Sequence, residues 1–471
     1  MPTYNKSYIV YITLVATLGG LLFGYDTAVI SGTVSSLKSF FILPKGLEEL
    51  SANSLLGFLV SSALIGCIIG GAVGGLLALK LGRKKSLIVA AILFLISAIG
   101  SAMPEMGFSP IGNGSHIHLT QFVIYRIIGG IGVGLASMLS PMYIAEIAPA
   151  EKRGSLVSWN QFAIIFGMLV VYFVNYFISE LGNEDWLNAV GWRWMFASET
   201  IPAIIFLTLL FFVPESPRWL VLSDRLNEAK TVLNKINLPE EAEKILHDIQ
   251  TSLSDVSSKK VFSYGYLIII IGLLLSVFQQ FVGINVVLYY APEIFKNMGS
   301  GTSAALIQTI IVGAINLLFT VIAIVSVDRF GRKPLQIIGA LGMAVSMFTL
   351  GATFFMDQPG FGSLIAMLVY VASFALSWGP VTWVLLSEIF PNNIRGKAMA
   401  LAVAAQWISN YFVSWTFPMM NNSTWLTEKF NHGFAYWIYG IMGLLAALFM
   451  YKLVPETKGK SLEEMEGLWR K

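Results

Sequence analysis

Two oppositely charged residues lie in stretches of the chain that are otherwise apolar. Asp26 stands inside the run GGLLFGYDTAVISG, and Arg126 stands near the start of YRIIGGIGVGLASM. An ionised carboxylate is strongly unfavourable in such surroundings unless it is paired or protonated, and a nearby cation favours the charged form. We therefore predict that Asp26 exchanges a proton and that Arg126 is its partner. The alternatives are a static ion pair and an aspartate that is wetted from outside.

A second group of candidate residues is polar but uncharged, and its members also interrupt apolar stretches. An amide side chain both donates and accepts hydrogen bonds, so each one is either a contact between helices or a contact with a ligand. Trp383 follows Gly379 and Pro380, where a break in the helix would free backbone groups. The amides are Gln161, Gln279, Gln280, Asn285, Asn316 and Gln406.

Three charged motifs each occur twice, in the same order. The run EIAPAEKRG recurs as EIFPNNIRG, KLGRKK as RFGRKP, and VPESPR as VPETKG. The chain therefore consists of two related halves. The repeated charged residues predict ion pairs between helix ends that hold one face of the protein shut. The alternative is that some of the basic residues only mark the orientation of the chain in the membrane. The residues concerned are Glu146, Arg153, Glu388, Arg395, Arg83 and Arg332.

The elements that must carry these residues are membrane-spanning helices. Of the 471 residues, 56% are hydrophobic and 12% are charged, against about 25% charged in a soluble domain. Twelve apolar runs have roughly the 20 residues that a span needs, centred near residues 18, 66, 94, 132, 167, 203, 272, 314, 345, 373, 408 and 443. We expect an all-α integral membrane protein with parallel repeats, because an even number of spans returns each motif to the same side.

The placement of charge predicts orientation and the division of the chain. Most of the 30 Lys and Arg residues lie in the termini and the even-numbered loops, so both termini should be cytoplasmic. We divide the chain into a first half (1–214), a cytoplasmic helical linker (215–260), a second half (261–454) and a tail (455–471). The linker is either a tether or a latch. The single cysteine, Cys67, excludes an internal disulfide, and the scattered histidines indicate no metal site.

The chain resembles the sugar porter family of the major facilitator superfamily nearly from end to end. The resemblance rests on GGLLFGYDTAVISG, YRIIGGIGVGLASMLSPMYIAE, PESPRWL, FQQFVGINVVLYYAPEIF and VPETKGKSLEE. It implies the major facilitator fold, with 12 transmembrane helices in two six-helix halves joined by an intracellular helical linker. It also implies alternating access driven by the proton gradient, with no cofactor.

The same resemblance assigns roles to the polar and aromatic candidates. It implies that Gln161, Gln279, Gln280, Asn285, Trp383 and Gln406 hydrogen-bond a sugar. The sequence itself adds Gly379, at the helix break, and Asn316 as further candidates. The resemblance also implies an aromatic lining of Phe23, Tyr289 and Trp407, the flat apolar wall that a sugar ring needs. Met168 lies seven residues after Gln161 and stands where xylose symporters of this family carry glutamine. If that position touches the sugar, the preferred pentose or hexose changes, and if it packs, nothing changes.

The expected function is proton-coupled import of D-xylose or a closely related pentose or hexose. A facilitative uniporter is the alternative, and Asp26 argues against it because facilitative relatives usually lack this acid. A non-transporting sugar sensor is a different class, but the short tails offer no signalling domain. No nucleophile, base or metal cluster suggests an enzyme. We expect a monosaccharide, a proton and the lipid bilayer as partners, no nucleic acid, a monomer, and a location in the bacterial cell inner membrane.

Overall fold

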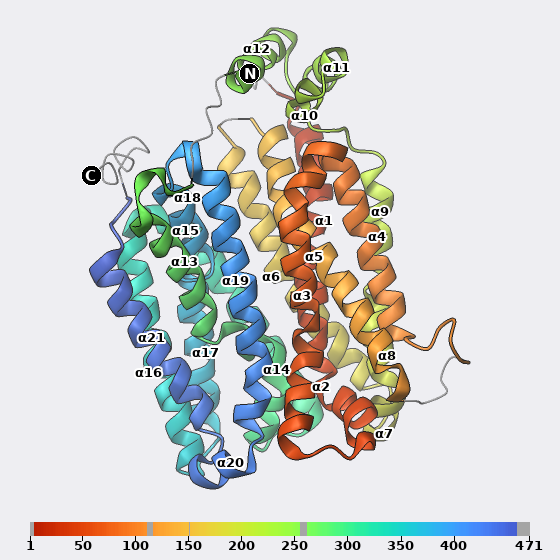
Figure 1. The fold of residues 1–471 in the computed structure, drawn as a ribbon, viewed down its shortest axis with the longest axis vertical. Coiled ribbons are helices and arrows are strands. Elements are labelled where there is room, and N and C mark those ends of the chain that lie inside the picture. The colour runs from red at the N-terminus through yellow and green to blue at the C-terminus, as the bar shows by residue number, and fades with distance from the viewer. Residues whose placement is uncertain (1–3, 111–115, 150, 255–260, 459–471) are drawn as a thin grey trace.

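The computed structural model describes residues 4–110, 116–149, 151–254 and 261–458, and the chain is 86% helical. The last residues of the expected linker (255–260) and most of the expected tail (459–471) lie outside the described residues. Two bundles of long helices stand side by side, coloured red to yellow-green and green to blue in Figure 1.

The first bundle contains the helices that precede the linker. They are α1 (Lys6–Val29), α2 (Val34–Leu37), α3 (Glu49–Leu81), α4 (Arg83–Ala102), α5 (Leu119–Ile147), α6 (Arg153–Ser179), α7 (Glu184–Trp186), α8 (Trp192–Ser198) and α9 (Thr200–Leu210).

The second bundle contains the helices that follow the linker. They are α13 (Tyr266–Phe281), α14 (Ile284–Asn297), α15 (Thr302–Phe330), α16 (Arg332–Phe355), α17 (Phe361–Leu376), α18 (Pro380–Ile389), α19 (Asn392–Asn421), α20 (Thr424–Phe430) and α21 (Phe434–Leu453).

Eleven helical stretches in the described part of the chain are long and apolar enough to cross a membrane, and each contains or adjoins one of the expected centres. The remaining centre, near residue 408, lies on α19, which has 30 residues and so measures about 45 Å. Its hydropathy is lower because Gln406, Asn410 and Ser414 interrupt it. Polar residues on a spanning helix face the protein interior rather than lipid. The length of α19 and its place among the other helices make it the twelfth span.

Two spans of the second half are broken halfway across. The tenth span stops at Leu376 and resumes as α18 at Pro380, so the break expected at Gly379-Pro380 is confirmed. The seventh span is also broken, between α13 and α14, at Gly283, whose φ of +92° lies in the left-handed region. A Cβ at Gly283 would lie 2.7 Å from the ring of Tyr439, so this position needs glycine for space as well as for conformation.

Between the bundles the chain forms α10 (Pro217–Leu222), α11 (Leu226–Ile236) and α12 (Pro239–Ser254), at the top of Figure 1. We call this end of the molecule the linker end and the opposite end, with α2, α7 and α20, the far end. The linker is tied to the first bundle, because Asn5 N donates to Ile236 O at 2.7 Å. The exact boundaries of the linker and its role as a latch stay predictions.

A single ion pair joins α11 to α12 in the described part of the linker. Lys230 Nζ lies 2.6 Å from Glu243 Oε1. The hydrogen bond from this ammonium group lowers the pKa of the Glu243 carboxyl. The pair is exposed, so it orients the two helices more than it stabilises them.

The two bundles meet at the far end. Trp415 Nε1 on α19 donates to Ser54 O on α3 at 3.1 Å, and Thr424 N donates to Glu49 Oε1 at 2.6 Å. Tyr172 OH on α6 donates to Leu288 O on α14 at 3.0 Å. Each of these bonds links one half to the other, so the far end is closed in this conformation.

Candidate functional site

The two charged candidates form a buried ion pair between α1 and α5. Arg126 Nη1 lies 2.7 Å from Asp26 Oδ1, and its Nη2 donates to Asp26 O at 3.1 Å. The side chains are 1% and 0% exposed. The guanidinium also lies over the ring of Phe196, 5.3 Å from its centroid. The predicted pairing of Asp26 with Arg126 is therefore present in the structure.

The ion pair leaves hydrogen-bonding capacity unused. Within the described part of the chain, Asp26 Oδ2 and Arg126 Nε have no partner. Gly129 on α5 makes room for the carboxylate, because a Cβ there would lie 3.2 Å from Asp26 Oδ1. A buried carboxylate oxygen without a donor is a position where a proton can bind.

A third buried ionisable residue, Glu199, lies beside this pair and was missed by the sequence analysis. Glu199 is 0% exposed, and its carboxyl group interacts with Asp26 and Arg126. Neither of its oxygens has a donor among the described residues. Two carboxyl groups can hydrogen-bond each other only when one of them carries a proton. Its position after the apolar run WMFAS was the available signal, since an acid inside a span is uncommon.

The broken helices bring several of the amides together. Gln279 Nε2 on α13 donates to Trp378 O at 2.7 Å and to Gly379 O at 3.3 Å, backbone groups that the break in the tenth span leaves free. Asn285 Nδ2 on α14 donates to Gln280 Oε1 at 2.6 Å, across the break at Gly283. Gln279 Oε1 is buried without a donor among the described residues. These amides therefore connect the broken segments by hydrogen bonds, and Gln279 Oε1 remains available as an acceptor.

Two other amides are not used in contacts between helices. Gln161 on α6 and Gln406 on α19 are half-buried, and neither makes a hydrogen bond within the described residues. The same is true of Trp383, which is half-buried on α18, and of Asn316, which is buried on α15. In the described part of the chain, these four residues therefore make no hydrogen bond that joins helices.

Aromatic candidates come from both halves. The rings of Phe23 on α1 and Trp407 on α19 lie 5.7 Å apart between centroids, so they form a contact across the two halves. Tyr289 is buried on α14, and its hydroxyl accepts from Asn410 Nδ2 at 3.4 Å. Met168 is 7% exposed, and its backbone N faces Gly24 of α1.

The repeated motifs build the same network in each half at the linker end. Arg83 Nη2 lies 2.7 Å from Glu146 Oε1, and Arg332 Nη2 lies 2.7 Å from Glu388 Oε1. The two glutamates also accept from hydroxyl groups of the third motif: Ser216 bonds Glu146 and Thr457 bonds Glu388. Each ion pair stays inside its own half, and Ser216 and Thr457 lie in the segments that directly follow the two halves.

The third motif also supplies two acids that the sequence analysis did not single out. Glu215 accepts from the backbone N of Arg83 at 2.9 Å, and Glu456 accepts from that of Arg332 at 3.2 Å. Each carboxylate therefore caps the first turn of a long helix, α4 or α16, where it satisfies free N–H groups and complements the helix dipole.

Two of the arginines expected in this network do not take part in it. Arg153 is exposed at the start of α6, and Arg395 Nε donates to Phe390 O at 3.2 Å. Neither forms an ion pair within the described part of the chain, so the predicted charge pairs exist for only four of the six residues in this conformation. The reason is local, since Arg83 and Arg332 already occupy Glu146 and Glu388.

Comparison with known proteins decides the family. A family model described as "Sugar (and other) transporter" matches residues 12–469. The chain belongs to the sugar transporter family. This membership confirms the prediction of a transporter rather than an enzyme.

Three sugar transporters of known sequence illustrate the relationship. The chain is 64% identical to the D-xylose-proton symporter of Escherichia coli (strain K12), over 99% of this chain and 96% of that protein. It is 42% identical to the glucose facilitated diffusion protein of Zymomonas mobilis, over 99% and 98%. It is 40% identical to the arabinose-proton symporter of Bacillus subtilis, over 100% and 97%.

Solved structures of the xylose transporter XylE from E. coli confirm the fold. The inward-open conformation matches with a TM-score of 0.89 at 62% identity, covering 98% of this chain and all of that one. The form bound to 6-bromo-6-deoxy-D-glucose matches with a TM-score of 0.83 at 63% identity, covering 99% of this chain and all of that one. The predicted major facilitator fold is therefore confirmed for this member of the sugar transporter family.

Proposed function

We propose that this protein imports D-xylose, or a closely related monosaccharide, together with a proton by alternating access. The observation that carries the proposal is the buried pair of Asp26 and Arg126, in which one carboxylate oxygen is free to take a proton. The similarity to a D-xylose-proton symporter over nearly the whole chain supports the same conclusion.

The proton acts by changing the strength of one buried contact. Deprotonated Asp26 holds Arg126 through a charge-assisted hydrogen bond, and protonation removes that charge. Arg126 remains close to Asp26 O, to the ring of Phe196 and to Glu199. An ionised Glu199 can neutralise the Arg126 guanidinium while Asp26 carries the proton. Protonation therefore changes the relative stability of the conformations without leaving an isolated buried cation.

The proton gradient is large enough for this task. One proton that crosses 100 mV releases about 2.3 kcal/mol, and one pH unit adds about 1.4 kcal/mol. Their sum limits sugar accumulation to roughly 500-fold at one proton per sugar. No cofactor is required.

The sugar is held between the two halves by amides and aromatic rings. Gln161 and Gln406 have unoccupied amide groups, and Gln279 has an unoccupied acceptor. A pentose presents hydroxyl groups that donate and accept, and Phe23 with Trp407 offers the apolar surface for its ring. The ligands come from α6, α13 and α19, so a bound sugar contacts both halves.

We propose that the linker end faces the cytoplasm of a bacterial cell and that the far end faces outward. The concentration of Lys and Arg on the side of the termini and the linker supports this orientation. The closed far end and the higher TM-score to an inward-open structure are consistent with it. We further propose that the protein acts as a monomer in the cell inner membrane.

A facilitative uniporter is the second candidate, favoured by the 42% identity to a glucose facilitated diffusion protein. The experiment that separates the two is uptake of labelled D-xylose and D-glucose into proteoliposomes with an imposed pH gradient. We expect the parent protein to accumulate sugar and Asp26→Asn to lose accumulation while it retains counterflow. Asparagine is chosen because it keeps an acceptor for Arg126, whereas leaving a buried cation unpaired costs about 3–5 kcal/mol.

A matched control is available at the far end. Glu105 is 2% exposed and pairs with Arg193 at 2.8 Å, so Glu105→Gln removes a buried carboxylate that belongs to a different ion pair. We expect Glu105→Gln to retain gradient-driven accumulation. Accumulation by the parent that does not respond to the gradient would establish the uniporter instead.

A further inference from the structure

Glu199 lies at an interruption between two helices. α8 ends at Ser198, and α9 begins at Thr200. In a regular α-helix the backbone N–H of Glu199 would donate to Met195 O, four residues earlier. It donates instead to Phe196 O at 3.2 Å, and the Ser198 hydroxyl donates to Met195 O at 2.6 Å. The side chain of Ser198 therefore takes the place of a backbone bond, which bends a helix at that point.

A tyrosine of α1 fixes this serine from the other side. The Tyr25 hydroxyl lies 2.7 Å from Ser198 Oγ, and Tyr25 is 3% exposed. Because Ser198 uses its own proton on Met195 O, the Tyr25 hydroxyl donates and Ser198 Oγ accepts. In the described part of the chain, this bond is the one polar contact between α1 and the α8–α9 stretch apart from that of their two carboxyl groups.

The bond is adjacent to the proposed proton site. Tyr25 directly precedes Asp26, and Ser198 directly precedes Glu199. The carboxyl groups of Asp26 and Glu199 interact with each other, and they repel when both are ionised. The bond between the two hydroxyl groups is neutral, so it holds the helices together in every protonation state of the acids.

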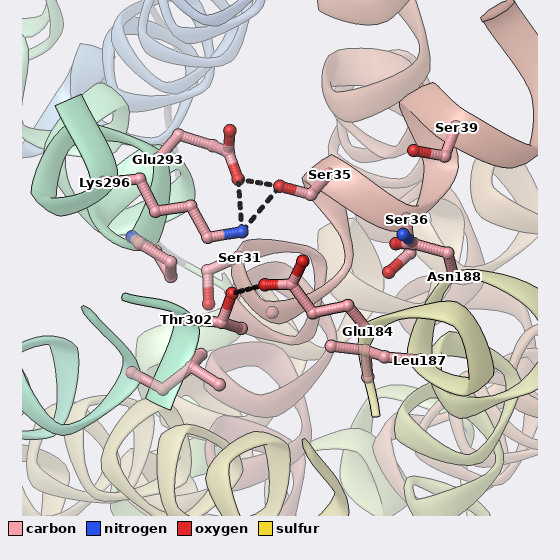
Figure 2. Close-up of a pocket in the computed structure, with 13 residues that line it drawn as sticks. Ser31, Ser35, Ser36, Ser39, Glu184, Leu187, Asn188, Glu293, Lys296 and Thr302 are labelled. Carbon is pink, nitrogen blue, oxygen red and sulfur yellow. Dashed lines mark hydrogen bonds and ion pairs between the residues drawn. The ribbon is translucent and has the colours of Figure 1, made fainter. Parts of the chain in front are cut away.

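The first span also leads to the contacts that close the far end. Figure 2 shows Ser35, on α2, bonded to Glu293 and to Lys296 of the second half. These contacts join the halves, so they must break when the far end opens. The bond of Tyr25 with Ser198 lies within the first half and can persist. A proton shared by the two acids therefore keeps its site while the far end opens and closes.

We propose that Tyr25 and Ser198 are positioning residues for proton coupling, because their hydrogen bond keeps the Glu199 carboxyl close enough to Asp26 to share a proton. The inference rests on the proposed function for the role of that proton. Loss of the bond lets the acids move apart, so the shared proton should be released at a lower pH. Moving two charges from about 4 to about 5 Å apart in a protein shifts a titration midpoint by about 0.6 pH unit.

Few other groups contribute to this titration. The ionisable groups that interact with the two acids are Arg126 on α5, Cys67 on α3, Tyr289 on α14 and Tyr25 itself. A guanidinium stays charged, and thiol and phenol groups are essentially neutral at and below pH 7. A titration in that range therefore reports the two carboxyl groups.

The test measures these carboxyl groups directly, in the purified full-length protein. The infrared band of a protonated carboxyl group is followed against pH, and its loss in Glu199→Gln assigns it. We expect the band to disappear at a lower pH in Tyr25→Phe, which keeps the ring and removes only the hydroxyl. Ser198→Ala should shift the titration in the same direction, and Ser198→Thr, which retains a hydroxyl, should match the parent. Adding Tyr25→Phe to Ser198→Ala should cause no further shift, because both changes remove the same bond.

Tyr143→Phe is the matched control. Tyr143 is buried on α5, and its hydroxyl donates to Pro214 O at 2.6 Å, so this change also removes one hydrogen bond of a buried tyrosine. We expect its titration to equal that of the parent. The proposal is overturned by an equal shift in Tyr143→Phe, by a parental midpoint in Tyr25→Phe, by additive shifts in the double variant, or by a parent without the band.

The infrared titration does not depend on transport. A shift in Tyr25→Phe, without gradient-driven accumulation by the parent, would refute only the proton coupling. Gradient-driven accumulation by the parent, with an unshifted titration in Tyr25→Phe, would refute only the positioning role.

Discussion

Gly57 is the residue whose substitution should change the conformation of this protein most directly. It lies on α3, and a Cβ there would be 2.8 Å from the carbonyl carbon of Trp415 and 3.1 Å from its Cα, with the carbonyl oxygen closer still. Ordinary contacts begin at 3.4 Å, so the shortfall at the carbonyl carbon is 3.4 − 2.8 = 0.6 Å. Trp415 belongs to the other half, so Gly57→Ala pushes the halves apart at the far end.

The magnitude follows from the cost of overpacking. Adding one carbon to a closely packed contact typically costs about 1–3 kcal/mol. This cost falls only on the form with a closed far end, so the equilibrium should shift about 5- to 150-fold toward the form with an open far end. Sugar binding should survive and the rate of transport should fall, because the substitution touches neither the ion pair nor the amides.

The assay measures the distance between the halves at the far end. Spin labels on Lys45→Cys in the first half and Glu428→Cys in the second, both exposed, report this distance by double electron–electron resonance. We expect a longer-distance population to grow in Gly57→Ala. The same helix supplies a control, since a Cβ at Gly71 meets no atom within 4 Å. A distance distribution in Gly57→Ala equal to that in Gly71→Ala would refute the reasoning.

Three further predictions concern other parts of the protein. Glu199→Gln should lower gradient-driven accumulation in proteoliposomes and leave counterflow intact, because an amide cannot share a proton with Asp26; unchanged accumulation would remove Glu199 from the coupling group. Gln161→Ala should weaken xylose binding about tenfold by calorimetry, the loss of one hydrogen bond worth about 1.4 kcal/mol, and an unchanged affinity would show that this amide does not touch the sugar. Glu456→Gln should destabilise the protein by about 1 kcal/mol, seen as a lower Tm in detergent, since it weakens the cap of α16, whereas an unchanged Tm would show that the cap carries no stability.

Sequence patterns were sufficient for the long-range organisation of this protein. The apolar runs predicted the spans because a bilayer imposes a fixed length, and the repeated motifs predicted two related bundles. The pairing of Asp26 with Arg126 was predictable because an isolated buried charge is very unfavourable. A buried carboxylate therefore needs an oppositely charged partner, and few such residues lie in the apolar runs. Gly379-Pro380 marked the break in the tenth span because proline lacks the N–H of a regular helix.

Other features depend on three-dimensional packing and could not be predicted from the sequence. Gly283 breaks the seventh span without a neighbouring proline, and glycine alone is common within spans. Glu199 gave a signal, but only its position beside Asp26 shows that it belongs to the same charged group. The motif acid Glu215 bonds a helix start 132 residues earlier in the chain, which no local pattern indicates. Which amides stay free for a ligand, as Gln161 does, is likewise decided by tertiary contacts.

The confinement of the charge networks at the linker end to single halves has a kinetic consequence. Arg83 with Glu146, and Arg332 with Glu388, stay paired within their own bundles while the far end is closed. In this conformation, the described residues of these networks hold no ion pair across the linker end, whereas re-opening the far end breaks the bond of Trp415 and the contacts of Glu49 and Glu293. An empty carrier should therefore rest with its far end closed. Its return to the outward-facing form, rather than sugar release, would then limit the turnover number.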